Sequence, residues 1–367
     1  MDESRSAGDS LEARMAGYCA MLQSRGAIHS EAVAHAIATV RRDRCVAEFY
    51  ARGGLVTVPQ DTVPSPDVLD LVYSDRALVT FVHGDVSSSS QPSLVATMLE
   101  ALDLSPGMRV LEVGAGTGYN AALIAVITGG PVVTVDSSGN IAAKARQALS
   151  RLGMEQQVTV VHGDGYGGHS TAAPYDRIVV TCGCVGFSPY WLEQLAENGL
   201  VLAPVAHGGW HPVVAIADPT RARMMIWSDF MPASGPLSDR RLPMLDTISS
   251  NVEFTPHTHV GPALDWDGYM SLWCFLGARD PRTTRVNTEF HGIDAAKGMC
   301  ALNDPRRGIA WIQMDGTIHV TGDAALLDEV MRLVEEWETL GRPSVQDWTC
   351  TLSRSGAVLA PARWSLG

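Results

Sequence analysis

The segment Val110–Tyr119 constrains the fold of this chain more than any other. It has the sequence VLEVGAGTGY, in which a short apolar run leads into alternating glycines, and an apolar run with helical character follows at Ala121–Ala125. This order predicts a strand, a tight turn and a helix. Glycine suits a turn whose backbone bends sharply and approaches a ligand closely. The segment therefore predicts a turn that binds a nucleoside-bearing cofactor.

The spacing of the glycines separates this turn from two familiar nucleotide sites. Gly114, Gly116 and Gly118 follow a Gly-x-Gly-x-Gly pattern, whereas the dinucleotide fingerprint is Gly-x-Gly-x-x-Gly. No Gly-Lys-Ser or Gly-Lys-Thr follows the turn, which argues against a triphosphate-binding P-loop.

Further apolar runs alternate with helical segments after the turn. They predict additional strands at Pro131–Val135, Val158–Val161, Arg177–Thr181 and Leu200–Pro204. This alternation predicts an α/β fold with a doubly wound, mainly parallel Rossmann-like sheet, and ligands at the carboxyl ends of its strands.

Glu112, Asp136 and Asp164 all lie near that edge of the predicted sheet, and Asp136 follows the turn by about 20 residues, where such folds place a ribose-binding acid. Acids repel a pyrophosphate but suit a cofactor with hydroxyls, an amine and a sulfonium. S-adenosylmethionine therefore fits better than NAD, although any single acid is also explained as a helix N-cap or a solvated carboxylate. We predict cofactor contacts by Ser87, Ser88, Glu112, Gly114, Ala115, Gly116, Gly118, Asp136, Ser137, Gly163, Asp164, Gly165 and Thr181.

Several separated motifs resemble one methyltransferase family in order along the chain. They are Met21–Ile28, Glu31–Ile37, Val40–Arg42, Ser90–Pro92, Leu104–Val110, Gly163–Gly165, Pro174–Asp176 and Leu195–Leu200. From Met15 to about Gly235 the sequence resembles the protein-L-isoaspartate O-methyltransferases. The resemblance implies paired N-terminal helices and an S-adenosylmethionine-dependent class I methyltransferase core, with S-adenosylhomocysteine as the product.

The chemistry implied by the resemblance is methyl transfer to an aspartyl or isoaspartyl carboxylate. An ionised carboxylate is already a nucleophile, so the site must mainly align it and exclude water. A serine hydroxyl can hold one carboxylate oxygen by a hydrogen bond. We assign this role to Ser90, with substrate contacts from Ser89, Gln91 and Ser93. The methyl ester would then close to a succinimide, or aspartimide, with loss of methanol and without further catalysis.

The sequence also departs from the family pattern. Arg41 replaces the proline of the family's Val-Pro-Arg segment, Ser93 replaces the usual histidine, and Ser87–Ser89 stand where the family has Gln-Thr-Ile. A flexible serine-rich loop without a catalytic role remains an alternative for Ser87–Ser90.

Composition restricts the other classes of function. The net charge of −13 argues against nucleic acid as a partner. No apolar run approaches membrane-spanning length, and the polar N-terminus lacks a signal-peptide core, so we expect a cytoplasmic protein. We expect no metal site, because neither Cys182 and Cys184 nor the histidine pairs His207/His211 and His257/His259 have further ligands at recognisable spacing.

The chain continues well beyond the part that resembles the family. We predict an N-terminal helical segment at 1–80, a methyltransferase core at 81–235 and a C-terminal extension at 236–367, with a linker at Ser234–Ser238. In the extension, Gly308–Gln313 and Thr317–Thr321 predict a hairpin, Asp323 is the expected cap of a helix, and Trp348–Leu352 predicts a strand. These elements predict a small α+β domain for substrate recognition.

Long homologues with such an extension resemble O-methyltransferases encoded with ribosomally made, modified peptides such as lanthipeptides and graspetides. This resemblance implies a cyclised precursor peptide as the substrate. A general isoaspartyl repair enzyme remains an alternative, as does an inactive cofactor-binding scaffold. The sequence does not indicate the oligomeric state.

Overall fold

The computed structural model describes residues 3–51, 53–82, 84–218, 220–238, 257–286 and 299–367. The chain divides into two compact units. The first contains residues up to Cys182 together with Ser188–Leu202, and the second contains Gly183–Phe187 and Ala203–Gly367. The domain boundaries expected at 80/81 and 235/236 stay predictions.

The first unit is built around a parallel sheet with the strand order β9-β8-β5-β6-β7. The strands are β5 (Val110–Val113), β6 (Val132–Asp136), β7 (Val158–His162), β8 (Tyr175–Val180) and β9 (Leu195–Pro204), of which the first unit includes residues up to Leu202. All four residues of β5 are buried, as expected for a central parallel strand covered on both faces. This order confirms the predicted doubly wound sheet.

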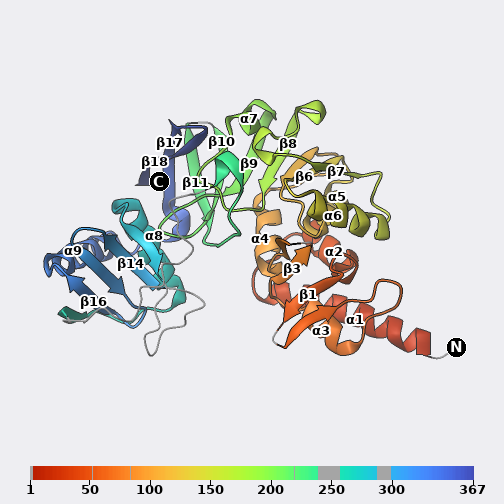
Figure 1. Ribbon diagram of the computed structural model, residues 1–367, viewed down its shortest axis with the longest axis horizontal. Coiled ribbons are helices and arrows are strands. Elements are labelled where there is room, and N and C mark those ends of the chain that lie inside the picture. The colour runs from red at the N-terminus through yellow and green to blue at the C-terminus, as the bar shows by residue number, and fades with distance from the viewer. Residues whose placement is uncertain (1–2, 52, 83, 219, 239–256, 287–298) are drawn as a thin grey trace. The chain divides into compact units, whose positions relative to one another are not determined.

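Helices α5 (Tyr119–Thr128) and α6 (Gly139–Arg151) pack against this sheet (Figure 1). Helix α5 is buried on nearly all sides, because alanine, leucine and isoleucine fill most of its positions. Helix α6 is amphipathic, and the Ser138 hydroxyl caps its amino end by accepting the N–H of Ile141. The short helix α7 (Pro189–Glu193) precedes β9.

The N-terminal part of the first unit contains the expected helices and also an antiparallel sheet that the sequence analysis did not predict. The helices are α1 (Glu3–Ser24), α2 (Glu31–Thr39), α3 (Pro66–Val72) and α4 (Pro92–Ala101). The four-stranded sheet has the order β2-β1-β3-β4, with β1 (Glu48–Ala51), β2 (Gly54–Thr57), β3 (Leu78–Val82) and β4 (Asp85–Ser89). Ser87–Ser89 therefore lie in a paired strand, and the flexible-loop alternative is wrong for them.

The second unit contains an antiparallel ribbon with the order β18-β17-β11-β10. Its strands are β10 (Val213–Asp218), β11 (Arg221–Ile226), β17 (Trp348–Ser355) and β18 (Val358–Leu366). Strand β17 confirms the predicted strand at Trp348–Leu352. It pairs with β11, so the last strands of the chain return to residues that precede the expected linker.

A five-stranded antiparallel sheet with the order β12-β16-β15-β14-β13 forms the rest of the second unit. Its strands are β12 (His257–Val260), β13 (Thr283–Val286), β14 (Met299–Asp304), β15 (Gly308–Ile312) and β16 (Thr317–Gly322), and α8 (Trp266–Arg279) and α9 (Ala325–Thr339) accompany them. Strands β15 and β16 confirm the predicted hairpin. Helix α9 begins one residue later than expected: Ala324 is its N-cap, and Asp323 accepts the N–H of Ala325.

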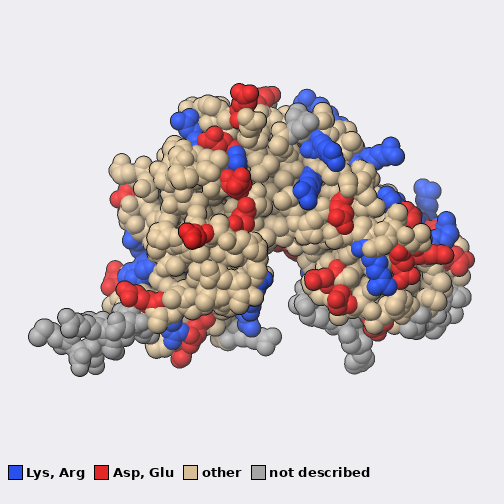
Figure 2. Space-filling view, turned by 180° about the vertical axis from the view of Figure 1, so that it is seen from behind, with Lys and Arg blue, Asp and Glu red and all other residues tan. Residues whose placement is uncertain are grey.

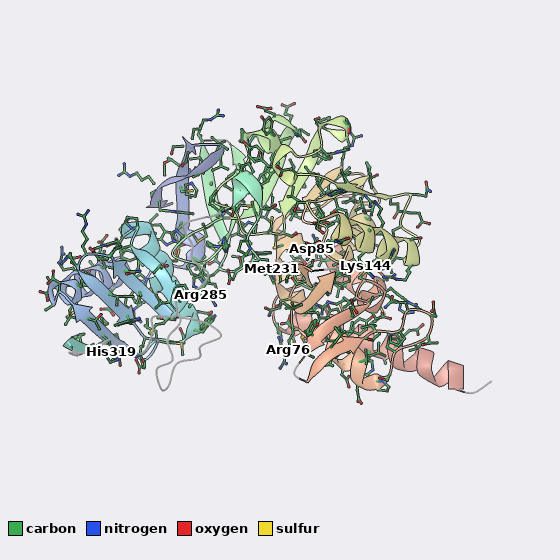
Figure 3. All side chains as sticks on the ribbon, in the orientation of Figure 1. Arg76, Asp85, Lys144, Met231, Arg285 and His319 are labelled. Atoms are coloured by element: carbon green, nitrogen blue, oxygen red, sulfur yellow. The ribbon has the colours of Figure 1, made fainter. Side chains whose placement is uncertain are left out.

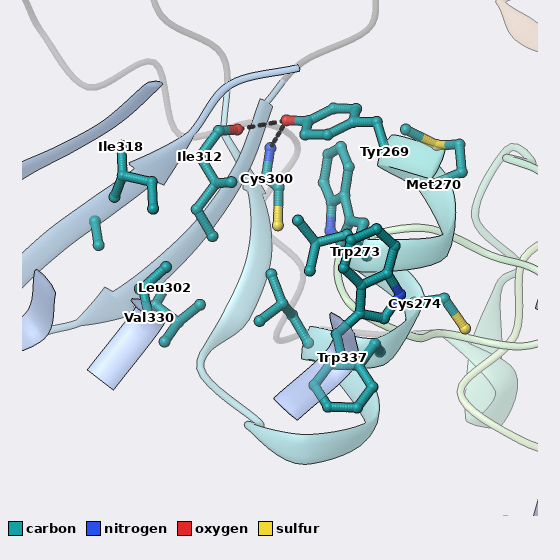
Figure 4. Close-up of a cluster of buried hydrophobic side chains, with 14 of the residues drawn as sticks. Tyr269, Met270, Trp273, Cys274, Cys300, Leu302, Ile312, Ile318, Val330 and Trp337 are labelled. Carbon is teal, nitrogen blue, oxygen red and sulfur yellow. Dashed lines mark hydrogen bonds between the residues drawn. The ribbon is translucent and has the colours of Figure 1, made fainter. Parts of the chain in front are cut away.

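A buried core joins α8, α9 and this sheet (Figure 4). Trp273 and Trp337 are almost completely buried in it. The Tyr269 hydroxyl donates to the Ile312 carbonyl oxygen at 2.6 Å and accepts the N–H of Cys300 at 3.0 Å (Figure 4). Because the tyrosine hydroxyl is satisfied by the backbone of two strands, α8 is oriented on the sheet as well as packed against it.

The expected linker at Ser234–Ser238 is not an extended connection. It contains a 3-10 turn at Gly235–Leu237, and the side chain of Leu237 is buried. The Leu237 carbonyl oxygen accepts the N–H of Val185 at 3.0 Å. Among the residues described, no helix is long and apolar enough to cross a membrane.

Candidate active site

The turn between β5 and α5 requires glycine at two positions. Gly114 has a φ of +101°, and a Cβ there would lie 2.4 Å from Oγ1 of Thr181, whose hydroxyl donates to the Gly114 carbonyl oxygen at 2.8 Å. Gly116 has a φ of +51°, and a Cβ there would lie 3.2 Å from the carbonyl oxygen of Ser88. Strand order reverses between β5 and β8, where doubly wound sheets bind ligands. The structure thus brings Thr181 and strand β4 to the predicted cofactor turn.

The Asp136 carboxylate lies beside the glycine turn at the end of β6. Its Oδ2 accepts the N–H groups of Ala115 and Gly116 at 3.1 and 3.3 Å, and its Oδ1 accepts the N–H of Ser138 at 2.9 Å. Burial raises the pKa of the Asp136 carboxyl, although these N–H donors favour its ionised form. The predicted ribose-binding acid is therefore held in a defined orientation by the turn itself.

Glu112 is fully buried inside the sheet. Its Oε1 accepts the side-chain amide of Asn120 at 2.8 Å, and its Oε2 accepts the Thr134 hydroxyl at 2.5 Å. Burial raises the pKa of Glu112 to about 7, against the lowering effect of these two hydrogen bonds. Both oxygens already have donors within the protein. We therefore propose that Glu112 stabilises the packing of β5 against its neighbours, in place of the cofactor contact predicted from the sequence.

The loop after β7 contains Asp164 and the neighbouring Gly163 and Gly165, for which cofactor contacts were predicted. The exposed Asp164 caps the short turn at Gly165–Gly167 by accepting the N–H of Tyr166 at 2.9 Å. A Cβ on the buried Gly165 would lie 2.4 Å from Cγ1 of Val113, so this residue allows the loop to approach β5. Gly163 donates its N–H to the Asp136 carbonyl oxygen at 2.9 Å, which holds the β7 loop next to β6.

Other residues with predicted cofactor contacts differ in their surroundings. A Cβ on Gly118 would lie 3.3 Å from the carbonyl oxygen of Ala145, so this glycine lets α5 and α6 pack closely. Ser137 is exposed after β6, whereas Ser87 is buried in β4. Cofactor contacts by these three residues stay predictions.

The segment Ser89–Gln91 connects β4 to α4, and we call it the acceptor loop. Its two serines have different environments. The Ser89 hydroxyl is buried and accepts Nε–H of Arg42 at 3.1 Å. Ser90 is half-buried, and among the described residues its hydroxyl has no hydrogen-bond partner. We therefore propose that Ser89 positions the loop, in place of the predicted substrate contact, while the Ser90 hydroxyl is available to an acceptor carboxylate.

The two remaining predicted substrate residues lie at the start of α4. Gln91 is the N-cap and donates from Nε2 to the Ser93 hydroxyl at 3.0 Å. Asp75, which the sequence analysis did not single out, accepts the N–H of Ser93 at 2.8 Å and is paired with Arg25. The carboxylate therefore fixes the amino end of the helix that follows Ser90.

Asp85 connects β4 to the cofactor side of the first unit. This residue was also not identified from the sequence. It begins β4, and Figure 3 labels it next to Lys144, a residue of α6. Its Oδ2 accepts the Ser138 hydroxyl at 2.6 Å and the Asn140 side-chain amide at 3.2 Å. These bonds join β4 to the start of α6.

Two histidines of the second unit, His207 and His211, have partners within the protein. His207 is buried against the Cys274 carbonyl oxygen at 2.9 Å, and burial lowers its pKa to about 4. His211 Nδ1 lies 3.2 Å from Oδ1 of Asp229. The side chain of His257 lies outside the described residues. Among the part of the chain that is described, no group of three or more His, Cys, Asp or Glu side chains is arranged to hold a metal ion.

Acidic and basic side chains are interspersed on the face drawn in Figure 2. In the second unit, Arg282 is paired with Asp280, Asp304 and Glu329 at 2.6, 3.1 and 2.8 Å. Partly exposed pairs of this kind contribute little individually to stability, but a shared arginine orients the three acids.

The doubly wound fold and the residues at the carboxyl ends of its parallel strands define the class of the protein. A doubly wound sheet with a glycine turn after β5, an acid at the end of β6 and crevice residues from β7 and β8 characterises the Rossmann-like methyltransferases that use S-adenosylmethionine. Comparison with known proteins then identifies the family. The model of protein-L-isoaspartate(D-aspartate) O-methyltransferases matches residues 17–226, and the chain belongs to this family of carboxyl O-methyltransferases. S-adenosylmethionine is its cofactor.

Individual relatives agree with this assignment. A protein-L-isoaspartate O-methyltransferase from Methanothermobacter thermautotrophicus is 36% identical over 221 residues, which cover 58% of this chain and 92% of that protein. One from Thermotoga maritima is 41% identical over 163 residues, which cover 44% of this chain and 51% of that protein. A solved structure of a protein-L-isoaspartate O-methyltransferase aligns with a TM-score of 0.55 at 27% identity, covering 95% of this chain and 98% of that chain.

Proposed function

We propose that this enzyme transfers the methyl group of S-adenosylmethionine to the carboxylate of isoaspartyl residues in proteins and peptides, as the first step of their repair. The observation that carries the proposal is the close approach of β4 to the cofactor turn. A Cβ on Gly116 would lie only 3.2 Å from the Ser88 carbonyl oxygen, and the half-buried Ser90 follows Ser88 by two residues. A carboxylate held at Ser90 would thus lie near the cofactor bound at the turn.

The chemistry needs few groups. The Ser90 hydroxyl donates a hydrogen bond to one oxygen of the acceptor carboxylate, and the other oxygen attacks the cofactor methyl group. The bound cofactor would supply the methyl group: its carbon–sulfur bond would break as the carbon–oxygen bond forms, leaving a neutral thioether and a methyl ester. No general base is required because the nucleophile is already ionised. Alignment and exclusion of water supply the rate enhancement.

The solved relative also bears on the choice of substrate. On sequence grounds, the continuation of the chain beyond the methyltransferase core favoured a modified precursor peptide as the substrate. The aligned protein-L-isoaspartate O-methyltransferase covers 95% of this chain, so much of the extension has a counterpart in an enzyme of that name. The extension is therefore no argument for a precursor peptide, and we favour the general repair activity. The cytoplasmic location stays a prediction.

A substrate panel tests the proposal. Labelled S-adenosylmethionine is supplied with an isoaspartyl peptide, with the same peptide containing ordinary aspartate, and with a cyclised aspartate-containing peptide. We expect efficient labelling of the isoaspartyl peptide alone. Labelling of only the cyclised peptide would replace the repair function by the precursor-modifying one. Tight cofactor binding without labelling of any peptide would instead favour the scaffold alternative.

A further inference from the structure

Arg42 is a completely buried charged side chain of the first unit. It begins the 3-10 turn at Arg42–Arg44, and its side chain has an exposed fraction of 0%. Its guanidinium donates to the Ser89 hydroxyl at 3.1 Å and to the carbonyl oxygens of Val72 (2.8 Å), Ser74 (3.1 Å), Arg76 (3.0 Å), Ser89 (3.2 Å) and Ser90 (3.0 Å).

These acceptors are all neutral. Two acids that neighbour Arg42 or its acceptors in sequence have other partners: Asp43 is paired with Arg41 and accepts the Tyr73 hydroxyl, while Asp75 is paired with Arg25. A buried charge without an ionic partner is costly to desolvate, and an apolar side chain of similar volume would avoid that cost. The hydrogen bonds of Arg42 therefore do something that an apolar side chain could not do.

The hydrogen bonds of Arg42 fix the backbone geometry of the acceptor loop. Arg42 holds two consecutive carbonyl oxygens, those of Ser89 and Ser90. Because each peptide group is planar and its N–H points opposite to its C=O, fixing these carbonyls also fixes both peptide planes. The backbone on either side of the Ser90 Cα is thereby set, and with it the direction from which the Ser90 hydroxyl projects.

The same guanidinium also contacts the cofactor side of the unit. Its Cζ lies 5.9 Å from the ring centroid of Tyr119, the first residue of α5 after the glycine turn. The ring of Tyr119 is buried, and burial raises the pKa of its hydroxyl. One side chain thus touches both the loop that presents the acceptor and the helix that follows the cofactor turn.

We propose that Arg42 is a positioning residue for methyl transfer, which holds Ser90 at a fixed distance from the cofactor turn. This proposal rests on the proposed function, and it identifies a residue on which the rate of methyl transfer depends. Arg42 is fully buried and bonded to Ser89 and Ser90, so it would act through the backbone of these two residues. Lysine cannot replace it, because an ammonium lacks the planar set of five donors that reaches carbonyl oxygens on several segments.

The test compares Arg42→Lys with a matched arginine away from the site. Arg177 donates to the carbonyl oxygens of Leu102, Asp103 and Asp176, and it pairs in register with Val110 at the amino end of β5. We expect Arg42→Lys to lower kcat for an isoaspartyl peptide about 10- to 100-fold, the cost of misplacing a reacting group. Affinity for S-adenosylhomocysteine should stay within about threefold. Arg177→Lys should leave kcat unchanged even where its melting temperature falls.

Ser89→Ala provides a milder perturbation for the case in which Arg42→Lys does not fold. It removes one acceptor of Arg42, and we expect a kcat decrease in the same direction without loss of cofactor affinity. Normal kcat in a folded Arg42→Lys enzyme would overturn the proposal. So would normal kcat in Ser89→Ala if the lysine variant does not fold, or equal loss of kcat in Arg42→Lys and Arg177→Lys.

Amide hydrogen exchange separates this proposal from the proposed function. Arg42→Lys, or Ser89→Ala in its place, should accelerate exchange at residues 88–91 relative to Arg177→Lys, whether or not any peptide is methylated. If the wild-type enzyme labels no isoaspartyl peptide, the proposed function fails, and exchange alone decides whether Arg42 holds the loop. Unchanged exchange at these residues would overturn the positioning role.

Discussion

The cofactor turn after β5 and the acceptor loop after β4 meet in the first unit, but different contacts hold them in place. The turn is shaped by its own backbone: glycines take left-handed conformations, and the N–H groups of Ala115 and Gly116 bind the Asp136 carboxylate. The acceptor loop is held from outside by Arg42, which lies 47 residues before Ser89 in sequence. The cofactor turn should therefore tolerate few substitutions of its own residues, whereas the acceptor loop depends on a side chain that is distant in sequence.

A substitution within the turn should have the largest effect. Gly114→Ala places a Cβ 2.4 Å from Oγ1 of Thr181 at a φ of +101°. We expect the affinity for S-adenosylhomocysteine to fall about 100-fold, because overpacking at a fixed backbone costs up to about 3 kcal/mol. Isothermal titration calorimetry measures the loss. Gly129→Ala is the matched control, since Gly129 has a φ of +58° but nothing within 4 Å of a Cβ. Equal losses in both variants would contradict the local account of the turn.

On the acceptor side, Ser90→Ala should separate catalysis from cofactor binding. We expect kcat for an isoaspartyl peptide to fall about 30-fold, the value of one hydrogen bond to a charged group, with unchanged affinity for S-adenosylhomocysteine. Steady-state kinetics and calorimetry on the same preparation measure the two quantities. Ser150→Ala, an exposed serine at the end of α6, serves as the control. Unchanged turnover in Ser90→Ala would remove this hydroxyl from the mechanism.

Glu112 should make the stability of the turn side depend on pH. Burial raises the pKa of this carboxyl from 4.5 to about 7. The folded protein therefore holds a proton that the unfolded chain releases, so this contribution to stability is complete below about pH 4.5 and is lost as the pH rises to about 7. We expect wild-type stability to fall relative to Glu112→Gln by about 1 kcal/mol per pH unit across this window.

Urea unfolding at several pH values between about 5 and 8 measures this difference. Glu155→Gln, at an exposed position, should keep the wild-type dependence. If wild type and Glu112→Gln showed the same pH dependence, Glu112 would not titrate in the folded protein as its burial implies.

The smallest expected effect concerns the start of α4. Asp75→Asn weakens the acceptor of the Ser93 N–H and the ion pair with Arg25. We expect a loss of about 1 kcal/mol in the free energy of unfolding, the usual value of a helix cap, and a smaller change in kcat than in Ser90→Ala. Thermal unfolding and steady-state kinetics check both. Asp67→Asn in the first turn of α3 is the control. A kcat loss as large as that of Ser90→Ala would show that the helix start, and not Arg42, sets the loop.

The sequence by itself determined the glycine turn and the acid beside it, while their contacts with the cofactor stay predictions. Gly114, Gly116 and Asp136 were identified correctly as neighbours because strands and tight turns arise from local backbone preferences, and parallel strands bring their carboxyl ends to one edge. The hairpin at β15 and β16 and helix α9 followed from local periodicity in the same way.

Only the tertiary structure decided how the acceptor half is held. Nothing in the pattern around Arg42 distinguishes a buried guanidinium from a solvated one, because its acceptors are backbone carbonyl oxygens, which every residue carries. The strand at Ser87–Ser89 was hidden for a related reason, since its pairing with β3 is a contact between segments and serine favours strands only weakly. Likewise, Glu112 was recognisable as an acid at the sheet, while its complete burial came from the packing of α5 and β6 around it.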